Sequence, residues 1–201
     1  KTGVLEECYN DADINYGTTG GNLAGVVYNT SDQTAAGTTE PTSWIKKCYN
    51  TGKIYGKNNV FGFSYNIKKG VLVEDCYNTG DVTAAGTNAS FGFTAAITSN
   101  NAENLVPTQI RRCWNGGNVT STTVASQVAA GFAKSVAAGT IIEDCYNLGD
   151  VTVKAQATSK TQICCAVGFI GTISGGHISR CWNAGTVYGL TPCNAGIAGY
   201  I

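Results

Sequence analysis

The chain has no methionine, a single histidine and few charged residues, which make up 13% of its 201 residues. Because a first methionine and a cationic, apolar leader are both missing, we expect a fragment or a processed piece of a longer protein. With only His177 and no Cys-x-x-Cys pair, the sequence argues against a zinc site, and His177 receives no role. Thirteen basic and thirteen acidic residues cancel, so neither nucleic acid nor an anionic membrane surface is an expected partner. No membrane insertion and no cofactor are predicted.

An amphipathic helical pattern is also missing, whereas short β-branched or aromatic runs separated by Gly, Asn and Thr occur throughout. Such runs are typical of β-strands, so the predicted fold class is all-β. A hydrophobic content of 43% is too high for a disordered chain and too low for a membrane protein. We therefore expect a soluble folded unit.

A Cys-Tyr/Trp-Asn motif occurs six times and shows that the chain is a repeat protein. An apolar residue stands three positions before each cysteine, and isoleucine or valine stands six positions after it. Glycine lies four positions after the cysteine in five copies, and Ala12 takes that place in the first. A second element with glycine follows each motif, as in "VFGF" at 60–63 and "AVGF" at 166–169. Successive cysteines are 40, 28, 37, 32 and 36 residues apart, so the length changes lie in the linkers.

Repeats of this length are typical of a coiled ribbon of parallel strands, in which stacked turns bury a core that one turn cannot bury alone. We predict a single parallel β-helix, or β-solenoid, over residues 1–201, with two or three short strands per turn. Six rungs are expected, at residues 4–43, 44–71, 72–108, 109–140, 141–176 and 177–201. The predicted hand is right-handed, as in most connections between parallel strands.

Equivalent residues of successive rungs lie one above the other in such a stack. The cysteines are expected to form a column of small buried thiols, made of Cys8, Cys48, Cys76, Cys113, Cys145 and Cys181. The asparagines are expected to form a hydrogen-bonded amide ladder at a turn, made of Asn10, Asn50, Asn78, Asn115, Asn147 and Asn183. The glycines are expected at the bends.

The two residues before each cysteine alternate in charge from rung to rung. The charged members are Glu6, Glu7, Lys46, Lys47, Glu74, Asp75, Arg111, Arg112, Glu143, Asp144 and Arg180. Opposite charges on neighbouring strands contribute about 0.2–1 kcal/mol each, whereas a slip by one rung would bring like charges together. The alternation is therefore expected to specify register more than stability.

These motifs resemble the GLUG-type repeat, a short glycine-containing motif of bacterial surface proteins that include adhesins. The stretches "GGNLAGVVYN" (20–29), "AVGFIGTIS" (166–174) and "NAGIAGYI" (194–201) match that motif best, whereas "NVFGFSYN" and "SFGFTAA" lack its second glycine. The resemblance covers essentially the whole chain. It implies an extracellular β-solenoid stalk or adhesion segment, and it carries no catalytic residues.

Neither end of the sequence shows a polar capping segment, although solenoids need their open edges covered. Either further repeats of a longer chain cover the ends, or copies of this chain stack end to end. End-to-end stacking would place Glu6 and Glu7 of one copy over Arg180 of the next, and a contact of this kind builds a filament. A glycan or a host surface is a further candidate partner.

The aromatic residues that follow the cysteines form one column, made of Tyr9, Tyr49, Tyr77, Trp114, Tyr146 and Trp182. If the cysteines point inward, strand alternation sends these rings outward, where they could bind sugars by stacking. If the corner is bulged, the rings belong to the core, so a core or self-stacking role and a glycan-binding role are both open. Cys165 and Cys193 are expected to be vertical neighbours, and whether they form a disulfide is open.

Parallel β-helices also include polysaccharide lyases and hydrolases, which need converging carboxylates on adjacent rungs. Asp13, Asp81 and Asp150 lie two rungs apart, about 9.6 Å, which is too far to share one calcium ion. We therefore predict no catalytic residue, no metal and no enzyme, with a lyase or hydrolase as an alternative. The predicted function is a non-catalytic structural or adhesive module, as a surface stalk, an adhesin segment or a filament subunit, at the cell surface or outside the cell. Carbohydrate binding through the aromatic column is the other alternative.

Overall fold

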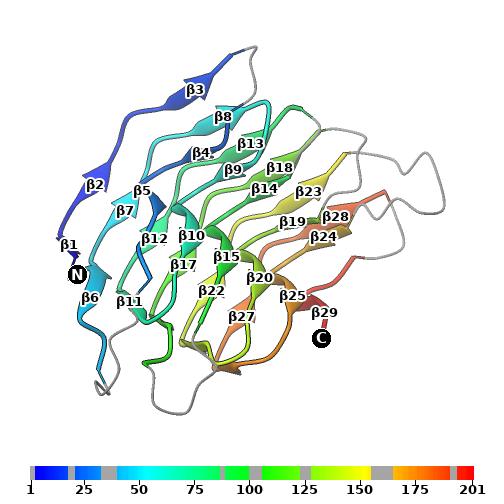
Figure 1. Cartoon of the computed structure of the whole chain (residues 1–201). Helices are drawn as coiled ribbons and strands as arrows, with labels where there is room; N and C mark the ends of the chain where they lie inside the picture. The colour runs from blue at the N-terminus through cyan, green and yellow to red at the C-terminus, as the bar shows by residue number, and fades with distance from the viewer. Residues whose placement is uncertain are drawn as a thin grey trace.

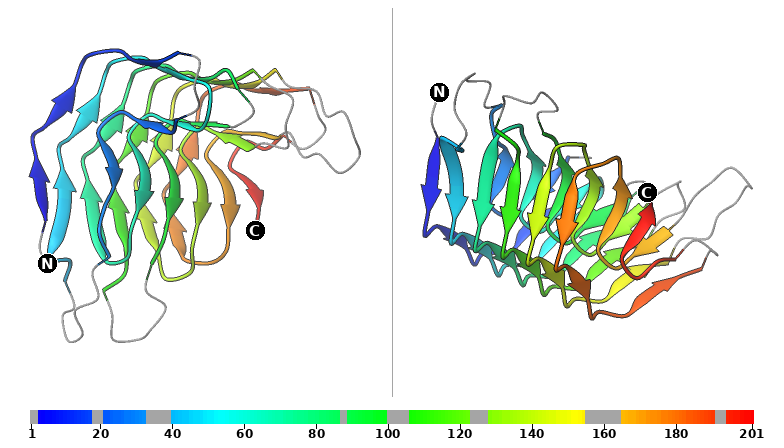
Figure 2. Two further views of the ribbon diagram at one scale, coloured as in Figure 1. Left: turned by 45° about the horizontal axis from the view of Figure 1, so that its top comes forward. Right: turned by 90° about the horizontal axis from the view of Figure 1, so that it is seen from below.

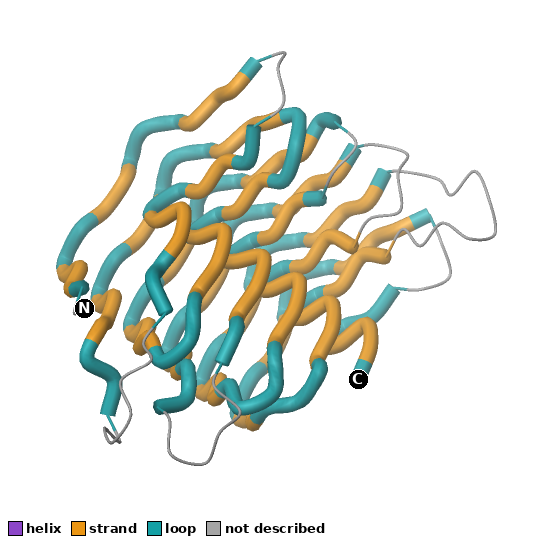
Figure 3. Tube along the Cα trace, viewed as in Figure 1, coloured by secondary structure: helices purple, strands orange, loops and turns teal. Residues whose placement is uncertain are grey.

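The computed structural model describes residues 3–17, 21–32, 40–86, 89–99, 106–122, 128–154, 165–190 and 194–201. Within these ranges the regular structure consists of strands of two to four residues, and no helix occurs. Along the described parts of the trace, strands alternate with short loops and turns (Figure 3). This arrangement follows from the short apolar runs of the sequence, each of which is too brief to cross more than one flat face.

Five parallel sheets run along the stack, and the chain passes through them in the same order in each turn (Figure 1). Sheet 1 contains β1 (Val4–Glu6), β6 (Ser43–Lys46), β11 (Val71–Glu74), β16 (Gln109–Arg111), β21 (Ile141–Glu143) and β26 (His177–Ser179). Sheet 2 contains β2 (Tyr9–Asn10), β7 (Tyr49–Asn50), β12 (Tyr77–Asn78), β17 (Trp114–Asn115), β22 (Tyr146–Asn147) and β27 (Trp182–Asn183). Sheet 3 contains β3 (Ile14–Tyr16), β8 (Ile54–Gly56), β13 (Val82–Ala84), β18 (Val119–Ser121), β23 (Val151–Val153) and β28 (Val187–Gly189).

The remaining two sheets hold the second element of each repeat. Sheet 4 contains β4 (Leu23–Ala24), β9 (Val60–Phe61), β14 (Ser90–Phe91), β19 (Val128–Ala130) and β24 (Cys165–Val167). Sheet 5 contains β5 (Val27–Asn29), β10 (Ser64–Ile67), β15 (Thr94–Ile97), β20 (Ala133–Val136), β25 (Ile170–Ile173) and β29 (Ala198–Tyr200). The two elements of the repeat therefore build different sides of the same solenoid.

The predicted fold class is confirmed, because every described strand pairing is parallel and equivalent residues lie opposite each other. In sheet 2, for example, Tyr77 lies opposite both Tyr49 and Trp114. Four sheets contain six strands, one from each copy of the repeat, whereas sheet 4 contains five. Among its described residues, the last copy contributes to sheet 4 only the isolated bridge between Val167 and Ala195. The two chain termini lie at opposite ends of the stack (Figure 2).

The number of strands per turn differs from the prediction. Each of the first five turns passes through five short strands, not the two or three expected. The reason is that corners interrupt the apolar runs every few residues. Three of these corners, where the chain returns from sheet 5 to sheet 1, carry glycines with positive φ: Gly70 at 74°, Gly139 at 77°, and Gly175 and Gly176 at 126° and 102°. Glycine accepts this conformation without the steric cost that a Cβ brings.

The corner between sheets 1 and 2 has the same left-handed backbone in all six copies. The residue just before the cysteine has a φ between 51° and 55° in each, namely Glu7, Lys47, Asp75, Arg112, Asp144 and Arg180. This conformation costs a residue with a Cβ about 1–2 kcal/mol. It also resets the alternation of the strand, so that two successive side chains point outward before the next one turns inward. Lys46 and Lys47 thus lie outside, while Cys48 is fully buried.

The main core lies between sheets 1 and 5. Four fully buried phenylalanines from the second element stack there at ring centroid distances of 4.5–4.7 Å, namely Phe63, Phe93, Phe132 and Phe169. They pack in one cluster with the apolar residues that precede the cysteines, such as Ile110 and Ile142. Each buried aromatic or aliphatic side chain stabilises the fold by about 1.5–3 kcal/mol. This core holds the corner between sheets 1 and 2 in place, where most of the polar candidates lie.

Candidate functional site

The cysteine column lies on the inner side of the corner, as predicted. Cys48, Cys76, Cys113 and Cys145 are fully buried, Cys181 is half-buried and Cys8 is exposed, and all six are free thiols. The Cys113 thiol donates to the Arg111 carbonyl at 3.2 Å and contacts the Val73 carbonyl of the preceding rung at 3.6 Å. Burial, followed by hydrogen bonding to the neighbouring thiols, raises the pKa of Cys113 well above its ordinary value. A neutral, enclosed thiol is a poor nucleophile, so Cys113 acts as packing.

The asparagine ladder is continuous along the described stack. Each Nδ2 donates to the Oδ1 of the next asparagine toward the C-terminus at 2.7–2.8 Å. Each also donates to the carbonyl oxygen of the residue two positions ahead, as Asn115 does to Gly117 at 2.7 Å. The four inner asparagines are fully buried. The predicted amide ladder is therefore present, and all its side-chain bonds run in one direction.

A contact that the sequence pattern does not indicate joins the two elements of the repeat. The inner glycines, which we define as Gly25, Gly62, Gly92, Gly131, Gly168 and Gly196, lie between sheets 4 and 5. A Cβ on Gly92 would overlap the Gly131 carbonyl oxygen and the amide of Asn115, both in the next rung. Gly25, Gly62, Gly131 and Gly168 are confined in the same way. The first element supplies the asparagine and the second supplies the space that it needs.

A second set of glycines is needed for close approach in the opposite direction. The bend glycines, which we define as Gly52, Gly80, Gly117, Gly149 and Gly185, stand four residues after the cysteines. A Cβ on Gly117 would overlap the Gly80 carbonyl oxygen of the preceding rung, and the other four are confined in the same way. None of them has a positive φ. They lie at the predicted bends, but the reason for glycine there is space and not backbone conformation.

The left-handed corner residues form ion pairs that join each odd rung to the rung after it. Lys47 Nζ lies 2.9 Å from Glu7 Oε1. Arg112 binds Asp75 through two hydrogen bonds, of 2.6 and 3.0 Å, and Arg180 binds Asp144 in the same way at 2.6 and 2.9 Å. These hydrogen bonds hold the pKa of the Asp75 carboxyl below its ordinary value.

The residues one position earlier join each even rung to the rung after it. Lys46 Nζ lies 3.2 Å from Glu74 Oε2, and Arg111 Nε lies 3.4 Å from Glu143 Oε2. The predicted charge alternation therefore appears as a ladder of ion pairs, in which Glu74 and Glu143 also pair with an arginine of the next rung, Arg112 at 2.8 Å and Arg180 at 3.6 Å. In the first rung, Glu6 accepts a hydrogen bond of 2.9 Å from the indole of Trp44, a partner that the charge pattern could not indicate.

The aromatic column lies on the outer side of sheet 2 and stacks on itself. Neighbouring rings are nearly parallel, with interplanar angles of 1–14° and centroid distances of 4.6–5.7 Å. Tyr9 and Trp182 at the two ends are 61% and 45% exposed, and the four rings between them are half-buried. The rings thus point outward, but each inner ring has both faces covered by its neighbours. Sugars stack on ring faces, and the inner column presents ring edges.

The three aspartates considered for catalysis or calcium binding are used between rungs. Oδ1 of Asp13 accepts the Lys53 backbone N–H at 2.8 Å, and Oδ1 of Asp81 accepts that of Asn118 at 2.9 Å. Asp150 binds the Thr186 N–H at 2.7 Å in the same manner. Each carboxylate therefore forms a hydrogen bond with the backbone of the rung that follows it. Among the described residues, no group of three or more His, Cys, Asp or Glu side chains could hold a metal ion.

Cys165 is disulfide-bonded, and it is buried in sheet 4. The six column cysteines are free, so the partner of Cys165 lies outside the described residues. Cys193 also lies outside them, and its predicted pairing with Cys165 stays a prediction. His177, at the start of β26, is exposed.

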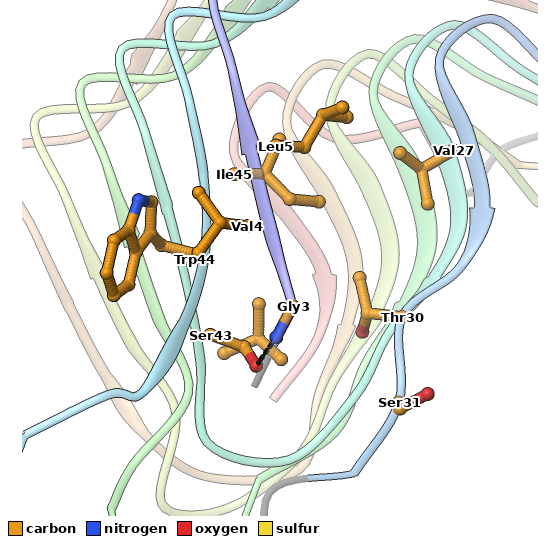
Figure 4. A pocket seen from close by; sticks show the side chains of 10 residues that line it. Gly3, Val4, Leu5, Val27, Thr30, Ser31, Ser43, Trp44 and Ile45 are labelled. Atoms are coloured by element: carbon orange, nitrogen blue, oxygen red, sulfur yellow. Dashed lines mark hydrogen bonds between the residues drawn. The ribbon is translucent and has the colours of Figure 1, made fainter. Parts of the chain in front are cut away.

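A cavity of about 390 Å³ opens between sheets 1 and 5 in the first rungs. Leu5 and Ile45 line it from one side and Val27 from the other, and Gly3 N donates to Ser43 Oγ at 2.8 Å on its wall (Figure 4). Its walls carry few polar groups, and the half-buried Leu5 and Val27 belong to the same apolar columns as the core. The cavity is thus the open N-terminal end of the core.

The described residues contain no helix that is long and apolar enough to cross a membrane. The chain matches no protein-family model, and no curated protein and no solved structure shows significant similarity to it. The ladders, the corner and the glycine contacts described above are therefore the features that bear on its function.

Proposed function

We propose that this solenoid is a non-catalytic structural segment of a cell-surface stalk or adhesin. One observation carries the proposal: the polar and aromatic side chains of the corner bind their counterparts in the next rung. The amide ladder, the ion pairs and the hydrogen bonds of the aspartates all join one rung to the next along the stack. These polar interactions hold neighbouring rungs together, as a stiff spacer requires.

The disulfide at Cys165 supports a location outside the cytoplasm, because structural disulfides persist in oxidising compartments. The column thiols are compatible with such a compartment, since burial shields four of them from oxidants. The resemblance to GLUG-type surface repeats points to the same location. A test is antibody labelling of intact source cells, in which the chain is detected before permeabilisation. Labelling only after permeabilisation would contradict the surface location.

Force spectroscopy on the chain held at its two ends tests the structural role. A stalk is expected to unfold in successive steps, each releasing one rung of 28 to 40 residues. At about 3.5 Å per residue, the steps should lengthen the chain by roughly 100–140 Å. Extension at low force without steps would contradict a load-bearing role.

The carbohydrate-binding alternative is supported by the outer position of the aromatic column. It predicts retention on mucin or a polysaccharide. Trp182 is the ring expected to bind the sugar, because only one of its faces is covered among the described residues. Trp182→Ala should then abolish retention, while Trp114→Ala, whose ring is covered on both faces, should not. The lyase alternative predicts ultraviolet-absorbing unsaturated products from uronic polymers. Either result would overturn the structural proposal, for which we expect neither retention nor products.

A further inference from the structure

The two end faces of the solenoid differ in whether another rung can stack on them. Inside the chain, rung stacking has two steric requirements, set by the bend glycines and the inner glycines. A bend glycine makes room for the carbonyl of the rung before it, and an inner glycine makes room for the carbonyl of the rung after it. The residues at these two positions in the first and last rungs therefore determine whether each end face can accept a further rung.

At the N-terminal face, the bend position holds Ala12. Its backbone has the same surroundings as the bend glycines, since Asn10 Nδ2 donates to the Ala12 carbonyl at 2.8 Å as Asn50 does to Gly52 at 2.7 Å. A Cβ at each of the five bend glycines would overlap the carbonyl oxygen of the rung before it. A rung placed in register over the N-terminal face would direct its own carbonyl at the Cβ of Ala12.

At the C-terminal face, the inner position that a following rung would contact holds glycine, Gly196. A Cβ on Gly196 would have no atom within 4 Å among the described residues, so nothing described demands glycine there. A following rung would demand it, because its carbonyl and its asparagine would lie against Gly196 as those of rung six lie against Gly168.

The amide ladder gives a second, independent sign at the same face. Each of the five preceding asparagines donates to two acceptors, whereas Asn183 donates only to the Gly185 carbonyl among the described residues. Its remaining N–H is directed along the ladder, where the Oδ1 of the next asparagine would lie. The C-terminal face thus offers a donor as well as space.

We infer that the solenoid grows in one direction: its C-terminal face is a binding surface for a further rung of the same repeat type, and its N-terminal face is not. The occupant carries an asparagine at the ladder position and a glycine four residues after its cysteine. Such a rung would continue the rung interface that occurs five times inside the chain. A second copy of this chain does not fit, because its first rung presents Ala12. Copies of residues 1–201 therefore do not stack head to tail in register.

Added rungs test this directly. In one variant, a copy of residues 72–108 follows Ile201 through a copy of residues 174–176, and in the other a copy of residues 44–71 replaces residues 1–3. Both are made with Ala12 and with Ala12→Gly. We expect the C-terminal rung to raise the urea midpoint in both backgrounds and to increase the m-value by about one-sixth, since seven rungs unfold where six did. We expect the N-terminal rung to do so only with Ala12→Gly.

Hydrogen exchange of the added rung provides a second readout, because a docked rung is protected and an undocked one exchanges freely. The inference fails if the N-terminal rung docks equally well onto Ala12, if it docks onto neither background, or if the C-terminal rung stays unprotected. It also fails if the unmodified chain forms filaments in electron micrographs at rising concentration, where we expect rods of a single length. These outcomes do not depend on where the protein is located, so they are separate from the tests of the stalk proposal.

Discussion

The inner and outer sides of the corner bind the same rungs in two different ways. Inside, the asparagine ladder repeats the same bond in every rung and is shielded from water. Outside, the ion pairs use two positions in each rung and lie in partly exposed surroundings. A buried hydrogen bond is costly to lose because its partners cannot turn to water, whereas exposed ion pairs contribute little. The inner ladder therefore supplies stability, and the outer one distinguishes a rung from its neighbours.

Replacing an inner asparagine should have the largest effect. Asn115→Ala would leave the Asn78 amide, the Asn147 carbonyl and the Gly117 carbonyl without their partner in the core. Since each unsatisfied buried group costs about 1–3 kcal/mol, we expect a loss of about 4 kcal/mol in the free energy of unfolding.

Asn10→Ala is the matched control, because this half-buried residue has the same type and the same ladder position in the first rung. It accepts no ladder bond from a described residue, and its loss should cost about 1 kcal/mol. Urea denaturation followed by circular dichroism measures both variants. Equal losses would show that burial of the ladder does not determine its contribution.

The inner glycine that faces this asparagine should rank second. Gly92→Ala places a Cβ against the Gly131 carbonyl and the Asn115 amide, and its φ is not positive, so the cost is steric. We expect about 2 kcal/mol of destabilisation, as for an overpacked core. Gly196→Ala makes the same chemical change where no described atom lies within 4 Å, and it should leave the urea midpoint almost unchanged. A large loss in the Gly196 variant would mean that backbone conformation, and not contact with the next rung, requires glycine.

The ladders could be predicted from the sequence because they depend only on equivalent residues standing in register. The cysteine, asparagine and aromatic columns and the charge alternation all follow from six aligned copies of one motif. Space between elements could not be predicted in this way. The pairing of Gly92 with Asn115 joins residues from different rungs and different sheets, and no spacing in the sequence indicates that they touch.

The left-handed corner could not be predicted from the sequence either. A positive φ is usually indicated by glycine or asparagine, and here the six positions hold glutamate, lysine, aspartate and arginine. Their common feature is an outward side chain that pairs with the corner of the adjacent rung. Without knowledge of this corner, the orientation of the aromatic column stayed open, since strict alternation and a bulge give opposite answers.

The ion pair between Asp75 and Arg112 should show the smallest effect and the clearest pH dependence. Its side chains are 41% and 50% exposed, so solvent screening limits the coupling to about 0.5 kcal/mol in a double-mutant cycle of Asp75→Asn and Arg112→Gln. Because the folded pKa of Asp75 lies below its unfolded value, the carboxylate stabilises the fold above about pH 4. That contribution is lost as the pH falls through the folded pKa. The double-mutant cycle, followed by urea denaturation, should therefore show the coupling at neutral pH and no coupling at acidic pH.

Lys134→Gln is the control for that cycle, since this exposed residue lies on sheet 5, away from the corner. Combined with Asp75→Asn it should show no coupling at either pH. Arg112 also lies 2.8 Å from Glu74, which remains available after Asp75→Asn, so the cycle isolates the Asp75 pair and not the whole contribution of the arginine. A coupling that persists at acidic pH would show that hydrogen-bond geometry, and not charge, joins these two rungs. The outer ladder would then differ from the inner one in exposure alone, and its alternating charges would need another explanation than register.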